Sequence, residues 1–244
     1  MTPFIELFAS VPRQGPGLAK DVTWAVETAG AEDATRACDA GCGTGADTAS
    51  LAAAMRGAAV VACEKDAGLI AAAQERHAGN ARITVRQGNM AALSALPEAP
   101  FDFIWCAGAI YFLGTVAGLR GFLGAMAPGG AVAFSAPVYF TDQPSGAARA
   151  FWMDVPVPTE AELRAQVAEA GYVLVADRPV TNAGWQALYT PLMKEIARRR
   201  AAGATEEMEA VMATMEAEKA TWEQVKRETG YQLVVARPAN PKET

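Results

Sequence analysis

The stretch of sequence that decides the fold is Ala37-Cys-Asp-Ala-Gly-Cys-Gly-Thr-Gly45. It places one acidic residue, Asp39, and three glycines between an apolar segment and a helix-forming segment. Glycine adopts backbone angles that other residues avoid, and it lets a ligand approach the main chain closely. The helix that follows offers unpaired N–H groups at its first turn. The stretch therefore predicts a ligand-binding turn between a buried strand and a helix.

The charge of Asp39 indicates which ligand this turn accepts. A carboxylate directly before the glycines repels a pyrophosphate, whereas it suits a ligand that carries an ammonium group and a sulfonium, as S-adenosylmethionine does. The spacing Gly41-x-Gly43-x-x-Ala46 with a later acid also fits a dinucleotide-binding fingerprint. The glycine spacing alone therefore leaves a nicotinamide dinucleotide open as the ligand.

Three segments together resemble the motifs of class I S-adenosylmethionine-dependent methyltransferases. Residues 39–45 resemble the first motif of that family, residues 83–90 its adenine-contacting segment, and residues 101–111 its fourth-strand motif. The resemblance covers the chain from about residue 35 to residue 135. It implies S-adenosylmethionine as cofactor, S-adenosylhomocysteine as product, and in-line transfer of a methyl group to a small-molecule acceptor.

The resemblance also implies a set of cofactor-binding residues. Glu64 follows the apolar run 58–63, where the family's acid holds the ribose hydroxyls, and Asn89 stands where many relatives carry Asp. In addition, Arg13 in the N-terminal segment is expected to reach a carboxylate of the donor or of the substrate. The expected cofactor-binding residues are Asp39, Gly41, Cys42, Gly43, Gly45, Glu64, Lys65, Asn89, Met90, Cys106 and Arg13.

Aromatic residues at the ends of the fourth and fifth expected strands and in the later helical segments predict the acceptor site. A sulfonium is attracted to ring faces, and methyl transfer requires that water be excluded. A base is needed only when the acceptor must lose a proton, and Tyr139, Asp142 and Tyr189 are candidates for it. The single histidine, His77, is expected at the surface. The residues expected to bind the substrate are Tyr111, Tyr139, Trp152, Trp185 and Tyr189.

The order of apolar and helical segments predicts an α/β fold, a doubly wound and mainly parallel sheet. Strands are expected near residues 35–40, 58–63, 82–87, 101–106 and 130–135, the last preceded by a turn at Pro128-Gly129-Gly130. The resemblance implies a Rossmann-like sheet of seven strands, ending in an antiparallel pair at 172–178 and 231–237. We expect one domain over residues 1–244. It comprises an N-terminal lid segment with the first helix (1–30), a core (31–181 and 230–238) and a helical insertion (182–229).

The helical insertion leaves two interpretations open. Apolar residues recur at helical spacing in its second half, which predicts an amphipathic helix: Met208, Val211, Met212, Met215, Trp222 and Val225. This helix either packs on the sheet domain or serves as a lid over the substrate. As a variant of the second interpretation, it forms a self-association surface and the protein is a homodimer.

Composition excludes several function classes. The chain has 244 residues, 51% of them hydrophobic, and 21 basic residues against 27 acidic ones, which gives a formal charge of −6. This balance argues against nucleic acid as a partner, and the basic run 198–200 is expected at the end of a helix. There is no apolar stretch that predicts a membrane span or a secretory signal, so we expect a cytoplasmic protein.

The four cysteines predict neither a metal site nor disulfides. They lie in or beside expected strands and lack the spacing of metal ligands: Cys38, Cys42, Cys63 and Cys106. Two alternative functions remain beside methyl transfer. One is an NAD(P)-dependent oxidoreductase, for which the sequence offers no hydride-transfer residues. The other is a catalytically silent S-adenosylmethionine-binding protein with a regulatory or assembly role.

Overall fold

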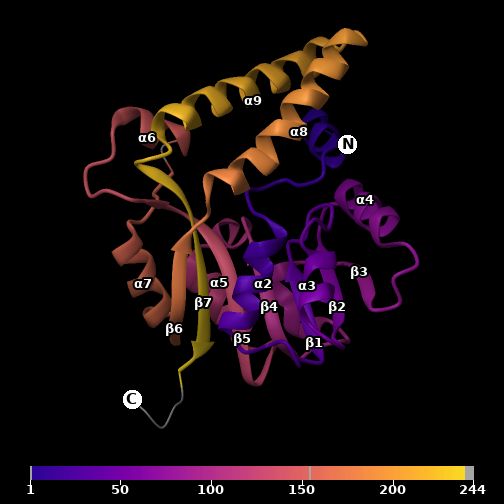
Figure 1. Ribbon diagram of the computed structural model, residues 1–244, viewed down its shortest axis with the longest axis vertical. Coiled ribbons are helices and arrows are strands. Elements are labelled where there is room, and N and C mark those ends of the chain that lie inside the picture. Colours follow the sequence, from indigo (N-terminus) through magenta and orange to yellow (C-terminus); the bar gives the residue numbers. More distant parts are fainter. Residues whose placement is uncertain (1, 154, 240–244) are drawn as a thin grey trace.

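The computed structural model describes residues 2–153 and 155–239 (Figure 1). Its described part contains one sheet of seven strands in the order β3-β2-β1-β4-β5-β7-β6. Neighbouring strands are parallel except β7, which runs antiparallel to both β5 and β6. The strands are β1 (Arg36–Ala40), β2 (Ala59–Glu64), β3 (Ile83–Gln87), β4 (Phe101–Ala107), β5 (Met126–Tyr139), β6 (Tyr172–Pro179) and β7 (Thr229–Pro238). The predicted doubly wound sheet with a final antiparallel pair is therefore confirmed.

The two faces of the sheet build two separate hydrophobic cores, because successive side chains of a strand point to opposite faces. In β4, for example, Trp105 belongs to one core and Cys106 to the other. The first core is covered by α2 (Ala19–Thr28) and α3 (Thr48–Ala54), and the second by α5 (Thr115–Leu123) and α7 (Glu160–Glu169). The strands β1, β2, β4 and β5 are accordingly buried on both faces over most of their length.

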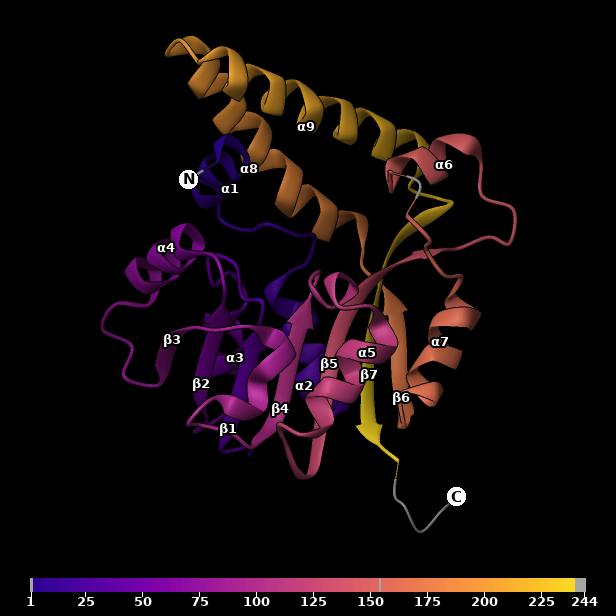
Figure 2. The same ribbon diagram turned by 180° about the vertical axis from the view of Figure 1, so that it is seen from behind.

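The remaining helices lie around the carboxyl ends of the parallel strands (Figures 1 and 2). There, α8 and α9 form a helical hairpin above the sheet, with α1 and α6 beside it. Two 3₁₀ turns, η1 and η2, follow β3 and β4. These helices and turns are α1 (Pro3–Ala9), α4 (Ala67–His77), η1 (Met90–Ala95), η2 (Ile110–Phe112), α6 (Gly146–Phe151), α8 (Asn182–Ala201) and α9 (Glu206–Val225).

The apolar face of α9 is used within the chain. Met208, Met212, Met215 and Trp222 are buried and belong to the same core as the inward side chains of α1 and α8. The predicted amphipathic helix is thus present, and it packs on neighbouring helices above the sheet. A homodimer through this insertion stays a prediction, and the apolar stripe of α9 does not supply its surface.

Two features of the fold differ from the expectations. The predicted turn at Pro128-Gly129-Gly130 lies inside β5, because the strand begins at Met126. Gly129 has a φ of +77°, and the register against β4 shifts at this point, so the segment distorts the strand without ending it. The N-terminal segment also contains a short helix, α1, which the sequence analysis did not predict.

We predict that Thr205 anchors the beginning of α9. Its hydroxyl accepts a hydrogen bond from the backbone N–H of Met208 at 3.3 Å, which satisfies a donor that the first helical turn leaves open. Thr205→Ala is expected to lower the free energy of unfolding by about 1 kcal/mol, measured by urea denaturation. Thr214→Ala in the exposed middle of α9 is the matched control. It is expected to be neutral or slightly stabilising, because alanine favours the helix interior. Equal losses in the two variants would contradict the capping role.

Candidate functional site

The predicted ligand-binding turn has the backbone that only glycine adopts without strain. Gly41, Gly43 and Gly45 have φ angles of +73°, +57° and +74°. A Cβ atom at Gly41 would also lie 2.8 Å from the Cβ atom of Ala109, which is too close for any carbon contact. We call residues 41–47 the glycine loop. Its first glycine is therefore required twice, by conformation and by the approach of the segment after β4.

Side chains from two distant elements lie against the other two glycines. A Cβ atom at Gly43 would overlap the Oε1 atom of Gln14, and one at Gly45 would overlap the Nε2 atom of His77. The expectation that His77 is exposed is wrong, since only 7% of its surface is accessible. Its Nε2 atom lies 2.9 Å from the carbonyl oxygen of Gly45 and must carry the proton, because a carbonyl only accepts. Burial lowers the pKa of His77, so the ring is neutral.

The backbone N–H groups of the glycine loop are held by protein groups. The N–H of Thr44 donates to Gln14 Oε1 at 2.9 Å, and the N–H of Gly43 donates to Glu64 Oε2 at 3.1 Å. The other carboxylate oxygen of Glu64 accepts from the N–H groups of Lys65 and Asp66 at 2.8 and 3.0 Å. Glu64 thus sits at the end of β2 with its carboxylate between the loop and α4. It is the place where the sequence predicted an acid that binds hydroxyl groups.

Asp39 is buried at the carboxyl end of β1, with 3% of its surface accessible. Its Oδ2 atom accepts a hydrogen bond from the hydroxyl of Thr48 at 2.6 Å. Burial and, to a smaller extent, the neighbouring carboxylate of Asp47 together raise the pKa of Asp39 from 3.8 to about 7, while the Thr48 hydroxyl opposes the shift. The Asp39 carboxylate is therefore at the edge of ionisation at neutral pH. A cation bound nearby would favour its charged form.

Arg13 does reach a carboxylate, but one that belongs to the chain itself. Its guanidinium forms a buried ion pair with Asp47 at 2.6 Å and also donates to the carbonyl of Gly17. Trp105 Nε1 donates to the second oxygen of Asp47 at 3.2 Å. These contacts fasten the N-terminal segment to the end of the glycine loop. The role of Arg13 as a ligand of the donor or the substrate stays a prediction.

The remaining predicted cofactor residues stand in the glycine loop or at the ends of β2, β3 and β4. Asn89 uses its side-chain oxygen to accept from the N–H of Ala91 at 2.9 Å, which caps η1. Met90 lies under Gly41, with its sulfur 3.3 Å from where a Cβ atom of that glycine would be. Lys65 is exposed. By contrast, the side chains of Cys42 and Cys106 are buried, and burial raises the pKa of both thiols, so neither is a thiolate.

The structure gathers four of the predicted substrate residues into one group of aromatic side chains. Trp185 lies at its centre, with its ring centroid 5.9 Å from Tyr189 and 5.6 Å from Tyr231. Tyr231 in turn lies 5.5 Å from Trp152 and 6.2 Å from Tyr111. We call this group the aromatic cluster, and its members are Tyr111, Phe151, Trp152, Trp185, Tyr189, Trp222 and Tyr231.

The other two candidate bases lie elsewhere. Tyr139 is buried at the end of β5 in a small core with Ala148 and Val225, and it borders Trp152. Asp142 is exposed on the loop between β5 and α6. Of the three candidates, only Tyr189 belongs to the aromatic cluster. Burial raises its pKa above the ordinary value, and the carboxylate of Glu218 adds to the shift.

Sequence reasoning missed Glu218, which hydrogen-bonds to a member of the aromatic cluster. Tyr189 donates its hydroxyl hydrogen bond to the Oε1 atom of Glu218 on α9 at 2.9 Å. Glu218 follows Met215 by three positions and precedes Trp222 by four, so it lies on the apolar face of the helix. An acid on an apolar stripe was the available signal. Gln14 and Thr48 gave no such signal, because their partners are distant in sequence or depend on the loop conformation.

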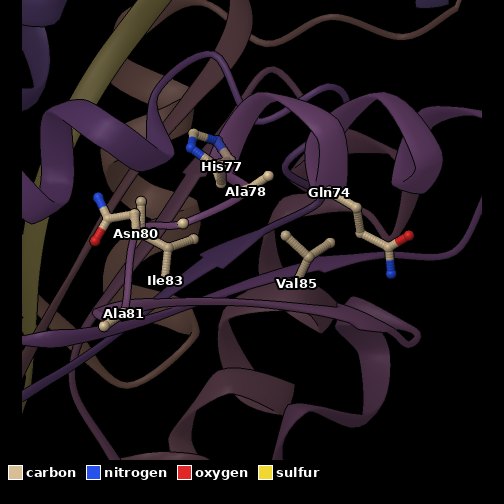
Figure 3. A pocket seen from close by; sticks show the side chains of 8 residues that line it. Gln74, His77, Ala78, Asn80, Ala81, Ile83 and Val85 are labelled. Atoms are coloured by element: carbon tan, nitrogen blue, oxygen red, sulfur yellow. The ribbon is translucent and has the colours of Figure 1, made fainter.

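The other features that could bind a ligand lie away from the glycine loop or lack suitable side chains. A hollow of about 430 Å³ lies between α4 and the edge strand β3, and its walls carry no acidic group (Figure 3). It is lined by Gln74, His77, Ala78, Gly79, Asn80, Ala81, Ile83 and Val85. Residues 2–153 and 155–239 contain no cluster of side chains suited to a metal ion. Within the same ranges, every helix is too short or too polar to cross a membrane.

We predict that Asp39 costs the fold stability at neutral and alkaline pH. In the unfolded chain this carboxyl ionises at its ordinary pKa, whereas in the folded protein it keeps its proton up to about pH 7. Its contribution to stability is therefore present at acid pH and lost as the pH rises from about 4 to about 7. Asn keeps an acceptor for Thr48 without the charge.

Asp39→Asn is consequently expected to be more stable than the wild type at about pH 8, by at most about 4 kcal/mol. The difference should vanish near pH 4, as measured by urea denaturation at both pH values. Asp33→Asn, at an exposed residue paired with Arg56, is the control and should show no such gain. A variant at position 39 that is less stable than the wild type at about pH 8 would refute the burial argument.

Comparisons with known proteins agree with this site. Residues 37–130 match the sequence model of a family described as a methyltransferase domain. Among curated proteins, no match was found. A solved structure of an S-adenosylmethionine-dependent methyltransferase from Geobacter sulfurreducens, in complex with S-adenosylhomocysteine, is 19% identical with a TM-score of 0.80. The match covers 96% of this chain and 97% of that chain.

Two further solved structures share the fold. A methyltransferase of the same description from Thiobacillus denitrificans, also in complex with S-adenosylhomocysteine, is 16% identical with a TM-score of 0.79. It covers 95% of this chain and 96% of that chain. The N-methyltransferase 2 of Haemonchus contortus, in complex with phosphomonomethylethanolamine and S-adenosylhomocysteine, is 15% identical with a TM-score of 0.67, covering 93% and 54%. Residues 37–130 thus match a methyltransferase domain, and the chain shares its fold with solved S-adenosylmethionine-dependent methyltransferases.

Proposed function

We propose that the protein transfers a methyl group from S-adenosylmethionine, bound along the glycine loop, to a small-molecule acceptor bound beneath α8 and α9. The observation that carries this proposal is the combination at the carboxyl edge of the sheet. Three glycines with positive φ stand between a buried carboxylate, Asp39, and a second carboxylate at the end of β2, Glu64.

The residues present fit this cofactor. The missing Cβ atoms of the glycine loop permit close approach to its main chain, and the flexible side chain of Gln14 lies against Gly43 there. In this family the methionine part of the donor belongs along this loop. Asp39 supplies negative charge behind the loop for the cationic groups. Glu64 offers carboxylate oxygens for the ribose hydroxyls, and Met90 with Asn89 borders the adenine side.

The contacts that the protein makes there also constrain the order of events. Gln14 Oε1 accepts from the N–H of Thr44, so a ligand carboxylate that uses this N–H must move the Gln14 side chain. Likewise, Glu64 must exchange its bond to Gly43 for a ligand hydroxyl or share it. Donor binding is therefore expected to displace the Gln14 side chain.

A small molecule is the acceptor class that the surface charge favours. The basic run at the end of α8 is neutralised by acids, because Arg198 pairs with Glu195, Arg199 with Glu6 and Glu195, and Arg200 with Glu209 and Glu216. Such paired arginines do not form a site for nucleic acid phosphates. The bound small amine in the Haemonchus contortus enzyme supports the same class.

The residues of the chain contribute mainly by positioning. Bound S-adenosylmethionine supplies an electrophilic methyl group whose leaving group is a neutral thioether, so its departure needs no acid. Holding the acceptor in line with the methyl group can contribute about 7–11 kcal/mol in ideal cases. The aromatic cluster excludes water from this region and offers ring faces toward positive charge.

The two alternative functions are not favoured. A dinucleotide-dependent oxidoreductase shares the glycine spacing, but the family model that matches residues 37–130 describes methyltransferases. A catalytically silent cofactor-binding protein would keep the glycine loop without an acceptor site. The aromatic cluster above the carboxyl ends of the strands argues for a protein that binds a second ligand.

The glycine loop tests the proposal directly. Gly41→Ala introduces a side chain at a φ of +73° and against Ala109, so we expect it to weaken S-adenosylhomocysteine binding at least about tenfold in calorimetry. Gly30→Ala is the control, because Gly30 has a φ of +55° but open space around it. That variant should lose a similar conformational term of about 1–2 kcal/mol in stability and keep its affinity. Saturation of the wild type with a nicotinamide dinucleotide instead would overturn the proposal.

The charge of Asp39 predicts how donor binding depends on pH. Only the ionised carboxylate attracts the cationic donor, and its pKa of about 7 puts the transition near neutrality. The affinity of the wild type for S-adenosylmethionine is expected to rise about tenfold between about pH 6 and about pH 8. Asp39→Asn should bind more weakly at about pH 8 and show a much flatter profile. Parallel pH profiles for both proteins would exclude Asp39 as the group responsible.

A further inference from the structure

Glu218 is a carboxylate that the mechanism so far does not use, and it lies in an unusual position. It stands on the buried face of α9, between Met215 and Trp222, where every other residue of the stripe is apolar. Glu218 itself is partly buried, so one part of its side chain remains within reach of a ligand. An ionised group at such a position normally has a cation as partner.

No such cation is found among residues 2–153 and 155–239. The hydrogen bond from Tyr189 is neutral, and no ion pair to Glu218 occurs in these ranges. The two nearest lysines, Lys219 and Lys226, both pair with Glu223, at 3.4 and 2.7 Å. Lys226 also places its ammonium group 5.3 Å from the centroid of the Trp222 ring, and neither lysine forms an ion pair with Glu218. Burial raises the pKa of Glu218, as expected for a carboxylate that lacks a positive neighbour.

Aromatic rings lie next to Tyr189, the hydrogen-bond partner of this carboxylate. Trp185 stacks on Trp222 with a centroid distance of 5.2 Å and an interplanar angle of 22°, and Tyr189 lies 5.4 Å from Trp222. The charge of Glu218 is also felt by two tyrosines of the sheet side. Burial raises the pKa of both Tyr111 and Tyr231, and the Glu218 carboxylate adds to each shift. Glu218 therefore faces the aromatic cluster.

The aromatic cluster connects α9 to the segment that contacts the glycine loop. Tyr111 belongs to η2, directly after β4, and 37% of its surface is accessible. It lies on the same segment as Ala109, which contacts the glycine loop. The aromatic cluster thus extends from Tyr111, on the segment that contacts the glycine loop, to Tyr189, which is bonded to Glu218. In addition, Trp222 Nε1 is buried with no hydrogen-bond partner in the described residues, which leaves a donor for a polar atom of a ligand.

We infer that the acceptor carries an amine, and that its positively charged nitrogen group is recognised by the Glu218 carboxylate and the nearby rings of Trp185, Trp222 and Tyr189. This inference rests on the proposed function, since it names the substrate class of that same site. A carboxylate close to aromatic rings attracts ammonium groups by charge and by cation–π interaction together. An anionic acceptor would be repelled by Glu218, and a neutral one would leave its charge uncompensated.

The test compares ligands of equal shape and different charge. Protein saturated with S-adenosylhomocysteine is titrated by calorimetry with phenethylamine and tryptamine, with their alcohols 2-phenylethanol and tryptophol, and with phenylacetate and indole-3-acetate. At least one amine is expected to bind about tenfold or more tighter than its alcohol, with the carboxylate weakest. The same amine should give a methylated product with S-adenosylmethionine. Its ammonium group passes a proton to the Glu218 carboxylate, and the neutral nitrogen then bonds to the methyl carbon while the bond from that carbon to the sulfonium sulfur breaks, which leaves S-adenosylhomocysteine. Equal binding of an amine and its alcohol, or binding of none of the amines, overturns the inference.

Charge removal provides the second arm. Glu218→Gln keeps an acceptor for the Tyr189 hydroxyl and is expected to weaken the amine about 10- to 100-fold while leaving the alcohol unchanged. Glu216→Gln removes a charge from the same helix at a carboxylate that pairs with Arg200, and it serves as the matched control. Glu218→Gln that binds the amine as the wild type does contradicts the inference.

Binding of S-adenosylhomocysteine separates this inference from the proposed function. Both variants are expected to bind it like the wild type, because neither residue belongs to the glycine loop. A protein that binds S-adenosylhomocysteine and methylates an alcohol or an acid, but no amine, refutes the amine class and keeps the methyltransferase. A wild type that does not bind S-adenosylhomocysteine refutes both.

Discussion

The burial of a carboxylate at the end of β1 is the constraint on which the rest of the site depends. Asp39 is 3% accessible, and among the described residues its side chain has one hydrogen-bond partner, the hydroxyl of Thr48 at 2.6 Å. Moving a charge out of water costs far more than one such bond returns. The fold tolerates this because the group is near its point of ionisation when alone. A cationic ligand near Asp39 would offset the cost of burying its charge. The buried carboxylate therefore favours cationic ligands over anionic ones.

The same physical logic recurs at Glu218 on the opposite side of the aromatic cluster. Each carboxylate lies where side chains limit its contact with water, each has a single hydroxyl as close side-chain partner, and neither forms an ion pair within the described residues. The ion pairs of the chain are formed elsewhere, for example along α8 and at Arg13. Two negative points on either side of a group of rings suit a reaction in which both the donor and the acceptor carry positive charge.

Much of the fold and the cofactor side could be predicted from sequence, because the signals there are local. The backbone of Gly41, Gly43 and Gly45 is decided by the residue type itself, and the alternation of strands and helices follows from apolar runs of characteristic length. Glu64 could be predicted to lie near the loop because the resemblance places an acid at a set distance after it, and its carboxylate does accept from the N–H of Gly43. Its binding of ribose hydroxyls stays a prediction.

Contacts between distant segments were out of reach of such reasoning. His77 looked like a surface residue at the end of a helix, yet its partner, Gly45, lies 32 positions earlier and is brought to it by the packing of α4. Gln14 is 30 positions from Thr44, and nothing in its local sequence indicates that it holds a loop amide. The distortion of β5 at Gly129 was equally hidden, because a turn and a bulge use the same residue types.

The N-terminal segment contacts both the glycine loop and α8, so it joins the expected donor side of the site to the expected acceptor side. Arg199 on α8 pairs with Glu6 on α1 at 2.5 Å, and Ser10 donates to Glu195 of the same helix at 3.2 Å, so α1 and α8 form one layer. A few residues later, the same segment is fastened to the glycine loop by Arg13 and Gln14. Gln14 thus belongs to a segment that is bonded both to the glycine loop and to α8, the helix that carries Trp185 and Tyr189 of the aromatic cluster.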